Sequence, residues 1–547
     1  MDLIASCSHR LSFSLPPCPY FPAPVTSQSG LVASMRSRLP ISRTTNMADL
    51  VSSFVSANEM LVNSVLGIDI LCDAFDPGAV FDSQDHYDRR CFPGTREQYI
   101  ADITNWVTES VGPPLSMYWM RGPAGVGKSA IAQTCAEKLK KSEHLGAAFF
   151  FTVDKHSNPS RLFTSIAYQL ATMLPDYCAT VDERISKDKT LVGKKMPSQF
   201  RSLIVEPLHE LEKQGKRIQP KAILIDGLDE CAGGDAQAEI IKIIASSVME
   251  GSTPFHWVIF SRAEPRIVSA FKQDNIASVI HSVELPISRE ADGEIELYLR
   301  GGFKNILKQR DFPQLLSSWP SDNDIRMLVD AADGLFAHPA AVLRHVAYPP
   351  DSQFHERLQS VLGALSDAGR QLSISSFSPL DALYVHIMKQ IPEHTLLSAL
   401  FLFFTWGGGN VNSGWYASLH CSVFRISECT FRDICHHLHA VVSYEAGSLS
   451  SLDPRIDLTR PYYDQGQWFH PDGSIRCHVW SAHGTFRFYH KSFYDFLCDP
   501  IRSGSFCINT PAIYCKFLDH FIQCHHHYAS SYAIDGESMY FLPFHLP

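Results

Sequence analysis

The chain has 547 residues, enough for about two to four domains of ordinary size. Hydrophobic residues make up 45% of it, which excludes a wholly disordered chain. The formal net charge of −10 argues against a protein that coats nucleic acid through a basic surface. The 15 cysteines form no CxxC pair, a pattern typical of reduced thiols in a cytoplasmic protein rather than of a disulfide framework. No apolar stretch reaches the ~18 residues of a membrane span.

The N-terminal part carries little recognisable pattern. Residues 1–46 are rich in serine, proline and arginine, and Asp2 is their only acidic residue. This composition predicts a disordered tail. Residues 47–90 are expected to form a helical linker. They are too short and too weakly patterned to identify as an effector domain.

A glycine-rich loop lies between an expected strand and an expected helix. The apolar run 117–120 is followed by a complete match to GxxxxGK[ST], made of Gly122, Pro123, Ala124, Gly125, Val126, Gly127, Lys128 and Ser129. Glycines let successive backbone N–H groups turn towards phosphate oxygens, and a helix over 128–141 adds its positive N-terminal end. We expect Lys128 to reach the β- and γ-phosphates and Ser129 to ligate Mg²⁺. Ala130, in the first helical turn, completes the expected nucleotide cradle.

A second apolar run, 222–225, leads into the acidic turn Asp226-Gly-Leu-Asp229-Glu230. A continuous apolar run is typical of a strand covered on both faces. We expect this strand to be the parallel neighbour of the P-loop strand, with Asp226 holding Mg²⁺ at the shared carboxyl edge. Asp229 or Glu230 would orient or polarise the attacking water, and the sequence does not choose between them.

A third expected strand, 257–260, ends at Ser261-Arg262. An arginine in this position can bond a γ-phosphate oxygen while ATP is bound and lose that bond after hydrolysis. Further strands are expected at 147–152 and 279–285, with helices at 159–173 and 236–249. This alternation predicts an α/β fold with a mostly parallel sheet and helices on both faces.

In this order, these segments resemble the NACHT-type STAND ATPases, and among them the NACHT proteins of mushroom-forming fungi, whose nucleotide domain is similar to the nephrocystin-3 N-terminal module. The resemblance covers about 85–300, with weaker likeness to about 500, and rests on the strings CFPGTRE, GPAGVGKS, AAFFFTVD, RLFTSIAYQLA, ILIDGLDE and WVIFSRAEPRI. It implies a P-loop signalling ATPase, related in mechanism to NOD-like receptors, that takes ATP or ADP with Mg²⁺.

The resemblance also implies a helical domain and a winged-helix-like domain after the nucleotide domain. We therefore expect a disordered tail, a helical linker, a NACHT P-loop domain, a helical domain, a winged-helix-like domain and a C-terminal helical remnant at 1–46, 47–90, 91–285, 286–370, 376–500 and 501–547. No repeat of 20–50 residues, such as the fungal relatives carry, is visible.

Further site residues come from the resemblance alone. Thr95 and Arg96 are positions where the family touches the adenine base. The string DGLF has Phe336 where many STAND proteins carry the proline of Gly-x-Pro, and the nearest proline is Pro339. In the string FYHKSFYDFL, His490 matches the histidine that bonds the ADP β-phosphate in related receptors and holds the closed state. An imidazole changes its protonation near neutral pH, which suits such a contact.

Two functions remain open at this stage. In the first, ATP and ADP stabilise different packings of the winged-helix-like domain, slow hydrolysis connects them, and the ATP form assembles into a homo-oligomer. In the second, the protein is a hydrolysis-inactive nucleotide-bound scaffold that recruits protein partners. We recognise neither the acceptor pocket of a metabolic kinase nor the further motifs of a helicase. The sequence gives no evidence for a nucleic-acid partner.

Two histidine-rich strings, CHHLH at 435–439 and CHHH at 524–527, invite a zinc interpretation. Their spacing fits neither CxxC nor HxxxH, and adjacent histidines on a helix point in different directions. We expect them to be histidine clusters without a metal.

Overall fold

The computed structural model describes most of the chain after residue 65, namely residues 66–83, 89–109, 117–152, 156–315, 318–348, 353–371, 379–407, 427–446, 463–464, 467–469, 475–478, 484–519 and 522. The expected tail 1–46, the first part of the expected linker 47–90 and the histidine-rich string 524–527 lie outside the described residues.

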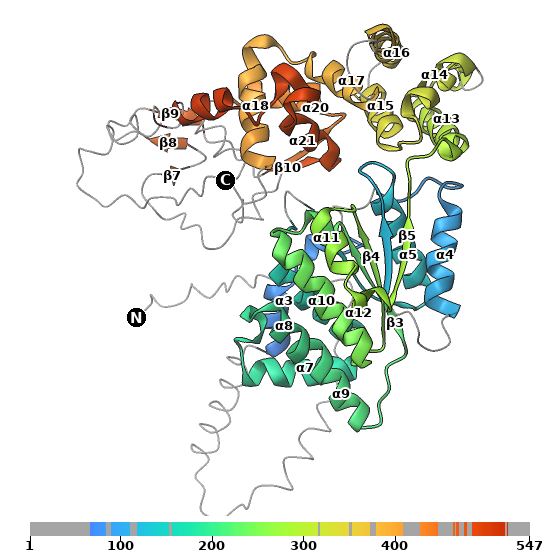
Figure 1. Ribbon diagram of the computed structural model, residues 1–547. Helices are drawn as coiled ribbons and strands as arrows, with labels where there is room; N and C mark the ends of the chain where they lie inside the picture. The colour runs from blue at the N-terminus through green and yellow to red at the C-terminus, as the bar shows by residue number, and fades with distance from the viewer. Residues whose placement is uncertain are drawn as a thin grey trace, which may run out of the picture. The chain divides into compact units, whose positions relative to one another are not determined.

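A five-stranded parallel sheet is the centre of the first half of the described chain (Figure 1). Its order is β2-β3-β4-β1-β5, and the strands are β1 (Met117–Arg121), β2 (Leu145–Phe150), β3 (Lys221–Asp226), β4 (Phe255–Ser261) and β5 (Ile280–Glu284). Nearly every residue of the first four is buried, which is why their sequences are almost continuously apolar. The expected α/β P-loop fold is confirmed.

The expected strand order is wrong in one respect. The P-loop strand β1 and the Asp226 strand β3 are not neighbours, because β4 lies between them and pairs in parallel with both. An apolar run identifies a strand buried on both faces but carries no information about which strand it pairs with. The consequence is functional. The end of β4, where Arg262 follows, is brought between the P-loop and Asp226.

Helices cover both faces of the sheet. Figure 1 shows α4 (Glu97–Glu109) and α5 (Lys128–Lys141) on one side, and α10 (Gly234–Glu250) and α11 (Pro265–Phe271) on the other. Residues alternate between the two faces along each strand, so that Tyr118 joins the apolar cluster of α4 and α5. Its neighbour Trp119 joins the cluster of α10 and α11 instead. These two clusters hold the strands in place between the helices, and the carboxyl ends of the strands form the site.

The remaining α-helices of this part and one π-helical turn lie on the side of the sheet that α10 and α11 cover, together with the first described helix of the chain. They are α3 (Gly67–Ala74), α6 (Leu162–Met173), α7 (Pro175–Lys187), α8 (Met196–Gln199), the π-helical turn η5 (Phe200–Val205), α9 (Glu206–Lys213) and α12 (Asp274–Ala277). The helix expected over 128–141 coincides with α5, and those expected at 159–173 and 236–249 correspond to α6 with the turn before it and to α10.

Helices dominate the second half of the described chain, with a small antiparallel ladder. They are α13 (Asp292–Gln309), α14 (Asp322–Ala332), α15 (Ala337–Ala347), α16 (Phe354–Gln371), α17 (Pro379–Met388), α18 (Glu393–Gly407), α20 (Glu428–Leu438), α21 (Lys491–Cys498) and α22 (Pro500–Ser503). The strand β6 (Val442–Ala446) pairs with β10 (Gly484–Phe488), and β7 (Tyr463–Asp464), β8 (Gln467–Phe469) and β9 (Ile475–His478) form a second ladder. One apolar cluster runs from α13 to α21.

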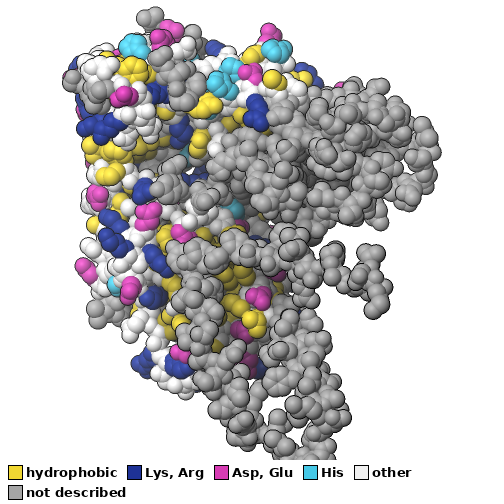
Figure 2. Space-filling view, turned by 180° about the vertical axis from the view of Figure 1, so that it is seen from behind, with side chains coloured by type: hydrophobic (Ala, Val, Ile, Leu, Met, Phe, Trp, Pro, Cys, Tyr) yellow, Lys and Arg dark blue, Asp and Glu magenta, His cyan; other side chains and the backbone are white. Residues whose placement is uncertain are grey.

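The surface carries both signs of charge. On the face seen in Figure 2, Lys and Arg side chains are interspersed with Asp and Glu over the described residues, without a continuous basic stripe. None of the described helices is long and apolar enough to cross a membrane.

Three histidines meet where α15, α17 and the end of α20 pack together. The ring of His345 lies 5.8 Å from that of His386 and 5.8 Å from that of His439, measured between centroids. Their hydrogen-bond partners among the described residues include Gln390, Ser360 and backbone carbonyls. Burial lowers the pKa of His345 to about 3 and also lowers the pKa of the other two imidazoles.

Acidification from pH 7 to pH 5.5 should therefore weaken the fold. An unfolded histidine takes up a proton below about pH 6.5, whereas folded His345 stays neutral down to about pH 3. The stability that neutral His345 provides is present above the unfolded pKa and is lost as the pH falls below it, by about 1.4 kcal/mol per pH unit for one such group. Urea unfolding at several pH values should give a shallower slope for His345→Asn. The exposed His209→Gln on α9 should match the wild type, and equal slopes for all three proteins would refute the assignment.

Candidate nucleotide-binding site

The P-loop connects β1 to α5 and its glycines are required by its backbone. Gly125 and Gly127 have φ angles of +83° and +101°, in the left-handed region that favours glycine. A Cβ on Gly125 would also come within 2.8 Å of the Cβ of Ala337. The N-terminal turn of α5 opens directly from Gly127, so its backbone N–H groups and positive dipole end face the loop. The expected strand, loop and helix are thus present in the expected order.

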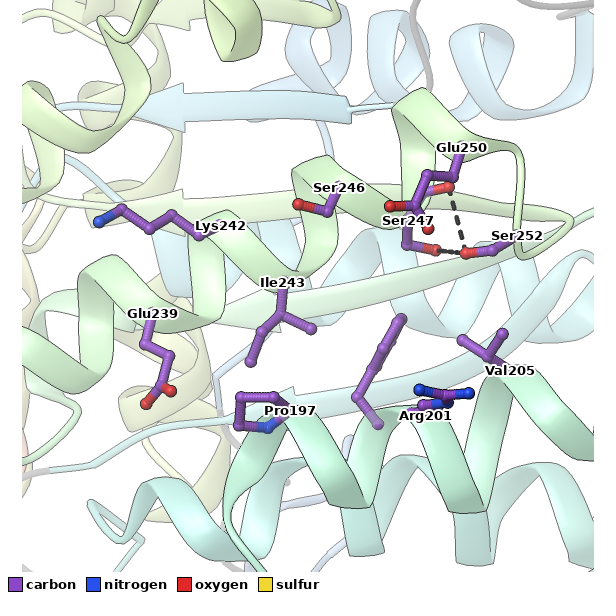
Figure 3. Close-up of a pocket in the computed structure, with 11 residues that line it drawn as sticks. Pro197, Arg201, Val205, Glu239, Lys242, Ile243, Ser246, Ser247, Glu250 and Ser252 are labelled. Carbon is purple, nitrogen blue, oxygen red and sulfur yellow. Dashed lines mark hydrogen bonds between the residues drawn. The ribbon is translucent and has the colours of Figure 1, made fainter.

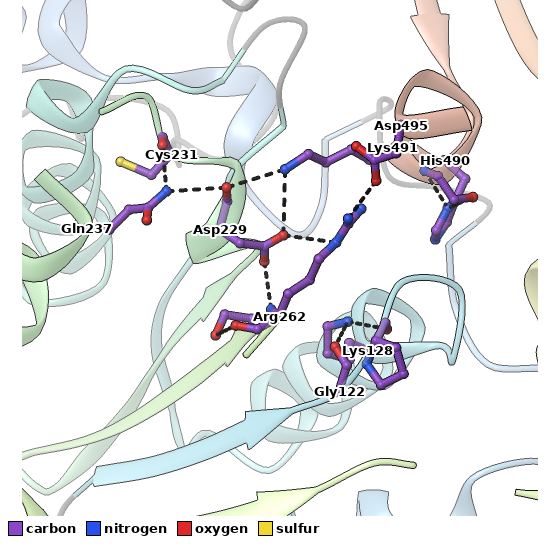
Figure 4. Close-up of polar contacts among 12 residues, drawn as sticks. Gly122, Lys128, Asp229, Cys231, Gln237, Arg262, His490, Lys491 and Asp495 are labelled. Carbon is purple, nitrogen blue, oxygen red and sulfur yellow. Dashed lines mark hydrogen bonds and ion pairs between the residues drawn. The ribbon is translucent and has the colours of Figure 1, made fainter. Parts of the chain in front are cut away.

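Lys128 lies folded over the loop that precedes it (Figure 4). Its Nζ donates hydrogen bonds to the carbonyl oxygens of Gly122 and Pro123, each at 2.8 Å. Burial lowers the pKa of Lys128, and the negative charges of Asp229 and Asp226 oppose that shift. An ammonium group is attracted more strongly to an anionic oxygen than to a neutral carbonyl, because both groups then carry a full charge. A phosphate entering the loop would therefore compete well for this side chain.

Asp226 ends β3 and is almost completely buried, with 3% of its surface exposed. Its Oδ1 has no hydrogen-bond partner among the described residues. Burial raises the pKa of Asp226 to about 6, although a hydrogen bond with Ser129 and the charge of Lys128 act in the opposite direction. A buried carboxylate oxygen without a partner is costly, and a carboxylate beside a hydroxyl is the donor set that Mg²⁺ accepts. Ser129 and Asp226 therefore fit a bound Mg²⁺.

The two acids after Asp226 have different surroundings. Asp229 is 7% exposed, and its Oδ1 accepts a hydrogen bond of 2.9 Å from the backbone N–H of Arg262. Its Oδ2 lies 3.3 Å from Nε of Arg262 and 3.8 Å from Nζ of Lys491. Burial raises the pKa of Glu230 to about 7, and the charge of Asp229 adds to this shift. Asp229 thus contacts Arg262 and Lys491 directly, whereas the pKa of Glu230 is raised by burial although the charges of the same two residues act to lower it.

Arg262 follows β4 and points across the site. Besides its contact with Asp229, its Nη1 lies 2.6 Å from Oδ2 of Asp495 on α21 (Figure 4). The sequence interpretation missed Asp495 and Lys491 as site residues. Both belong to the string FYHKSFYDFL, but the apolar spacing of that string is that of an ordinary amphipathic helix. The available signal was the pair of opposite charges four residues apart within it.

Thr95 and Arg96 lie beside the P-loop, on the strand-end side of α4. The hydroxyl of Thr95 is used locally and donates to the carbonyl of Phe92 at 2.7 Å. Arg96 has a positive φ of 58°, and its Nη2 donates to the carbonyl of Val126 at 3.0 Å. Its backbone N–H donates to Glu294 on α13 at 3.0 Å. Arg96 thereby connects the P-loop with the helices that follow the sheet.

The string DGLF docks on the same loop. The backbone N–H of Ala337 donates to the carbonyl of Gly125 at 3.0 Å. The ring of Phe336 lies under the guanidinium of Arg96, with 4.7 Å between the guanidinium carbon and the ring centroid. Pro339 lies within α15. At the position where many relatives have a proline, this chain therefore has an aromatic ring stacked on a cation.

His490 is the N-cap of α21. Its Nδ1 accepts a hydrogen bond from the backbone N–H of Ser492 at 3.1 Å and lies 2.6 Å from the Ser492 hydroxyl. Burial lowers its pKa to about 3, and the positive charges of Arg262 and Lys128 contribute to this shift. His490 therefore lies close enough to the P-loop for the charge of Lys128 to lower the pKa of its imidazole. With this pKa, the imidazole of His490 is neutral near pH 7 in this conformation.

Two surface cavities lie on the part of the chain that contains the sheet, and they differ in whether expected site residues line them. A groove of about 480 Å³ between α8–η5 and α10 is lined by Phe200, Ile243 and polar side chains, and none of the expected site residues lines it (Figure 3). A second cavity of about 490 Å³ is lined by Gly122, Pro123 and Arg262 among others, and therefore lies at the sheet edge discussed above. Within the described residues, no group of three or more His, Cys, Asp or Glu is arranged to hold a metal ion.

Part of the chain is similar to known proteins. Residues 94–262 match the family model described as nephrocystin 3, N-terminal. The chain is 23% identical over 320 residues to the vegetative incompatibility protein HET-E-1 of Podospora anserina, a match that covers 56% of this chain and spans 22% of that relative's length.

Similar solved structures include the Aeropyrum pernix ORC1 protein in complex with DNA, with 13% identity, a TM-score of 0.31 and coverage of 67% of this chain and 88% of that one. They also include Cdc6p from Pyrobaculum aerophilum, with 12% identity, a TM-score of 0.33 and coverage of 68% and 91%. The family match over residues 94–262 begins just before Thr95 and ends at Arg262, so this part of the chain resembles a NACHT-type P-loop nucleotide domain of the nephrocystin-3 N-terminal kind.

Proposed function

We propose that the protein is a nucleotide-switched signalling ATPase that binds ATP or ADP with Mg²⁺ and hydrolyses ATP slowly. The observation that carries the proposal is the buried Oδ1 of Asp226, which has no hydrogen-bond partner among the described residues and belongs to the same site as the Ser129 hydroxyl and the P-loop lysine. A structural role would leave such an oxygen hydrogen-bonded. A divalent cation held against a phosphate explains why it is buried without a partner.

The proposed roles follow the geometry. The backbone of the P-loop and the first turn of α5 would surround the phosphates, and this cradle consists of Gly122, Pro123, Ala124, Gly125, Val126, Gly127, Lys128, Ser129 and Ala130. Ser129 and Asp226 would hold the cation, which supplies neutralisation of the phosphate charge. Thr95 and Arg96 would border the adenine, and His490 would contact the β-phosphate of ADP. Arg262 would bond the γ-phosphate.

Glu230 is the proposed general base, and Asp229 the proposed positioning group for Arg262. The assignment rests on the contacts of Asp229 and on the raised pKa of Glu230. Asp229 accepts from the backbone N–H of Arg262 and faces its Nε, so it is placed to position that side chain. Glu230 has its pKa raised to about 7 and so accepts a proton readily near neutral pH.

We further propose the domain arrangement implied by the family: a nucleotide domain over 91–285, a helical domain over 286–370 and a winged-helix-like domain over 376–500. In the ATP form the protein would self-associate, and it would act in the cytoplasm on protein partners. The hydrolysis-inactive scaffold remains the second candidate. The observation that favours it is that Asp229 and Arg262 are both engaged by α21 in the described conformation.

Lys128→Ala should weaken ATP binding. Loss of a charge-assisted contact to the phosphates costs about 1.5–3 kcal/mol, or roughly 10- to 100-fold in affinity. Isothermal titration calorimetry with Mg²⁺ and ATP measures the change. Lys140→Ala is the matched control, because Lys140 lies on the same helix with its side chain exposed. Equal affinity in the wild type and Lys128→Ala would remove the nucleotide site from the proposal.

Asp226→Asn should stabilise the nucleotide-free protein while weakening its Mg²⁺-dependent binding of ATP. The folded pKa of about 6 lies above the ordinary 3.8, so the buried charge is destabilising and its cost appears as the pH rises through 6. At pH 7.5 the variant should gain about 1–3 kcal/mol in the free energy of unfolding. Urea unfolding without nucleotide, and ATP titrations with and without Mg²⁺, measure the two effects. A destabilised variant with unchanged Mg²⁺ dependence would contradict the assignment.

Glu230→Gln should reduce single-turnover ATP hydrolysis about 100-fold and leave ATP affinity nearly unchanged. The wild-type rate should rise between pH 6 and pH 8, because a carboxyl with a pKa of about 7 must lose its proton before it can accept one. Rapid-quench measurements on radiolabelled ATP test both statements. If the wild type shows no hydrolysis while binding ATP, the scaffold is the correct function.

A further inference from the structure

Two charged residues of α21 reach the proposed catalytic groups. Lys491 and Asp495 are four residues apart, so both lie on one face of the helix. Nζ of Lys491 donates to the backbone carbonyl of Asp229 at 3.4 Å and lies 3.8 Å from its carboxylate. Oδ2 of Asp495 accepts from Nη1 of Arg262 at 2.6 Å. In Figure 4 the four side chains form one connected set of dashed contacts.

Positive and negative groups alternate along this set, in the order Lys491, Asp229, Arg262 and Asp495. We call these four residues the α21 clasp. Their side chains are mostly withdrawn from solvent, with exposed fractions of 18%, 3%, 21% and 30% in that order. Water and salt therefore screen them less than an exposed surface pair, which is worth little. Removing one partner of such a set leaves the opposite charge poorly solvated.

The chemistry of Arg262 decides what the clasp does. A guanidinium binds a carboxylate and a phosphate in the same way, through planar N–H donors. Its Nε is directed at Asp229, and its Nη1 is occupied by Asp495. A guanidinium has five N–H donors, so a γ-phosphate oxygen that bonds Arg262 on its Nη1 side competes with the carboxylate of Asp495 for the same group. ADP has no such oxygen and leaves the contact intact.

We propose that Asp495 is a built-in competitor of the γ-phosphate for Arg262, and that Lys491 anchors α21 to Asp229, so that the α21 clasp favours ADP over ATP. This inference rests on the proposed function, because it requires a nucleotide with its γ-phosphate near Arg262. It assigns residues that the P-loop chemistry itself does not use. It also names an interaction by which the nucleotide can shift the packing of α21, since the γ-phosphate, which ADP lacks, competes with the clasped form for Arg262.

The test uses a charge exchange within one helix. The double variant Lys491→Asp/Asp495→Lys keeps the net charge and composition of α21 but places like charges against Asp229 and Arg262. The single variant Asp495→Asn removes only the competitor, and tests the same idea if the double variant does not fold. Asp433→Asn is the control, because Asp433 pairs with His437 on the exposed side of α20.

Competition titrations with a fluorescent ADP analogue, on the full chain with Mg²⁺, give the ratio of ATP to ADP affinity. We expect this ratio to rise roughly 10-fold in Asp495→Asn and in the double variant, chiefly through tighter ATP binding, and to stay unchanged in Asp433→Asn. Hydrogen exchange of the amides in α21 should also increase in the wild type when a non-hydrolysable ATP analogue replaces ADP.

The outcomes separate this inference from the function on which it rests. If the wild type binds both nucleotides and the ratio is the same in all variants, the α21 clasp is only a structural contact and the inference is wrong. If the wild type binds neither nucleotide, the proposed function fails and the clasp fails with it. A ratio that rises in Asp433→Asn as strongly as in Asp495→Asn would also overturn it, because the effect would then follow from general charge.

Discussion

A negative charge held out of water at the edge of the sheet is the constraint on which the rest depends. Asp226 is buried at the end of β3, between helices that cover both faces, and one of its oxygens has no hydrogen-bond partner among the described residues. Isolated, this arrangement is unfavourable, and burial accordingly raises the pKa of the carboxyl to about 6. The apolar clusters above and below the sheet supply the stability that keeps it there. With the cation of the proposed function bound, the same carboxylate would become a ligand, so the cost in stability would serve binding.

The strand order determines which groups can act together. Because β4 lies between β1 and β3, Arg262 emerges between the P-loop and the acidic turn, within reach of both. There it contacts Asp229, whose Oδ1 accepts from its backbone N–H and whose Oδ2 faces its Nε. A structure in which β3 paired directly with β1 would place Arg262 on the far side of the acidic turn. The contact between Arg262 and Asp229, on which the proposed roles of the two acids depend, is thus a consequence of topology as well as of local sequence.

The sequence predicted what is local and missed what is not. The P-loop, its flanking strand and helix α5 could be predicted because glycine conformation, apolar runs and helix signals act over a few residues. The order of the strands could not, since a strand buried on both faces looks the same in either position. The contacts of α21 were missed for the same reason. Asp495 is 233 residues from Arg262, and nothing in the local pattern of either residue specifies the other.

The helix α15 contacts both the P-loop and the residue that precedes α21. At its start, the N–H of Ala337 bonds the carbonyl of Gly125 in the P-loop. Two turns later Arg344 lies over the ring of Tyr489, 4.4 Å from its centroid, and Tyr489 directly precedes the N-cap of α21. Eleven helical residues span only about 16 Å, and a helix of that length moves as a rigid rod. The helix therefore contacts the P-loop at its first residue and, through Arg344, the residue that precedes α21. A shift of the P-loop backbone and a shift of α21 would both be felt at α15, so this helix is the second element, besides Arg262, at which the nucleotide site and α21 meet.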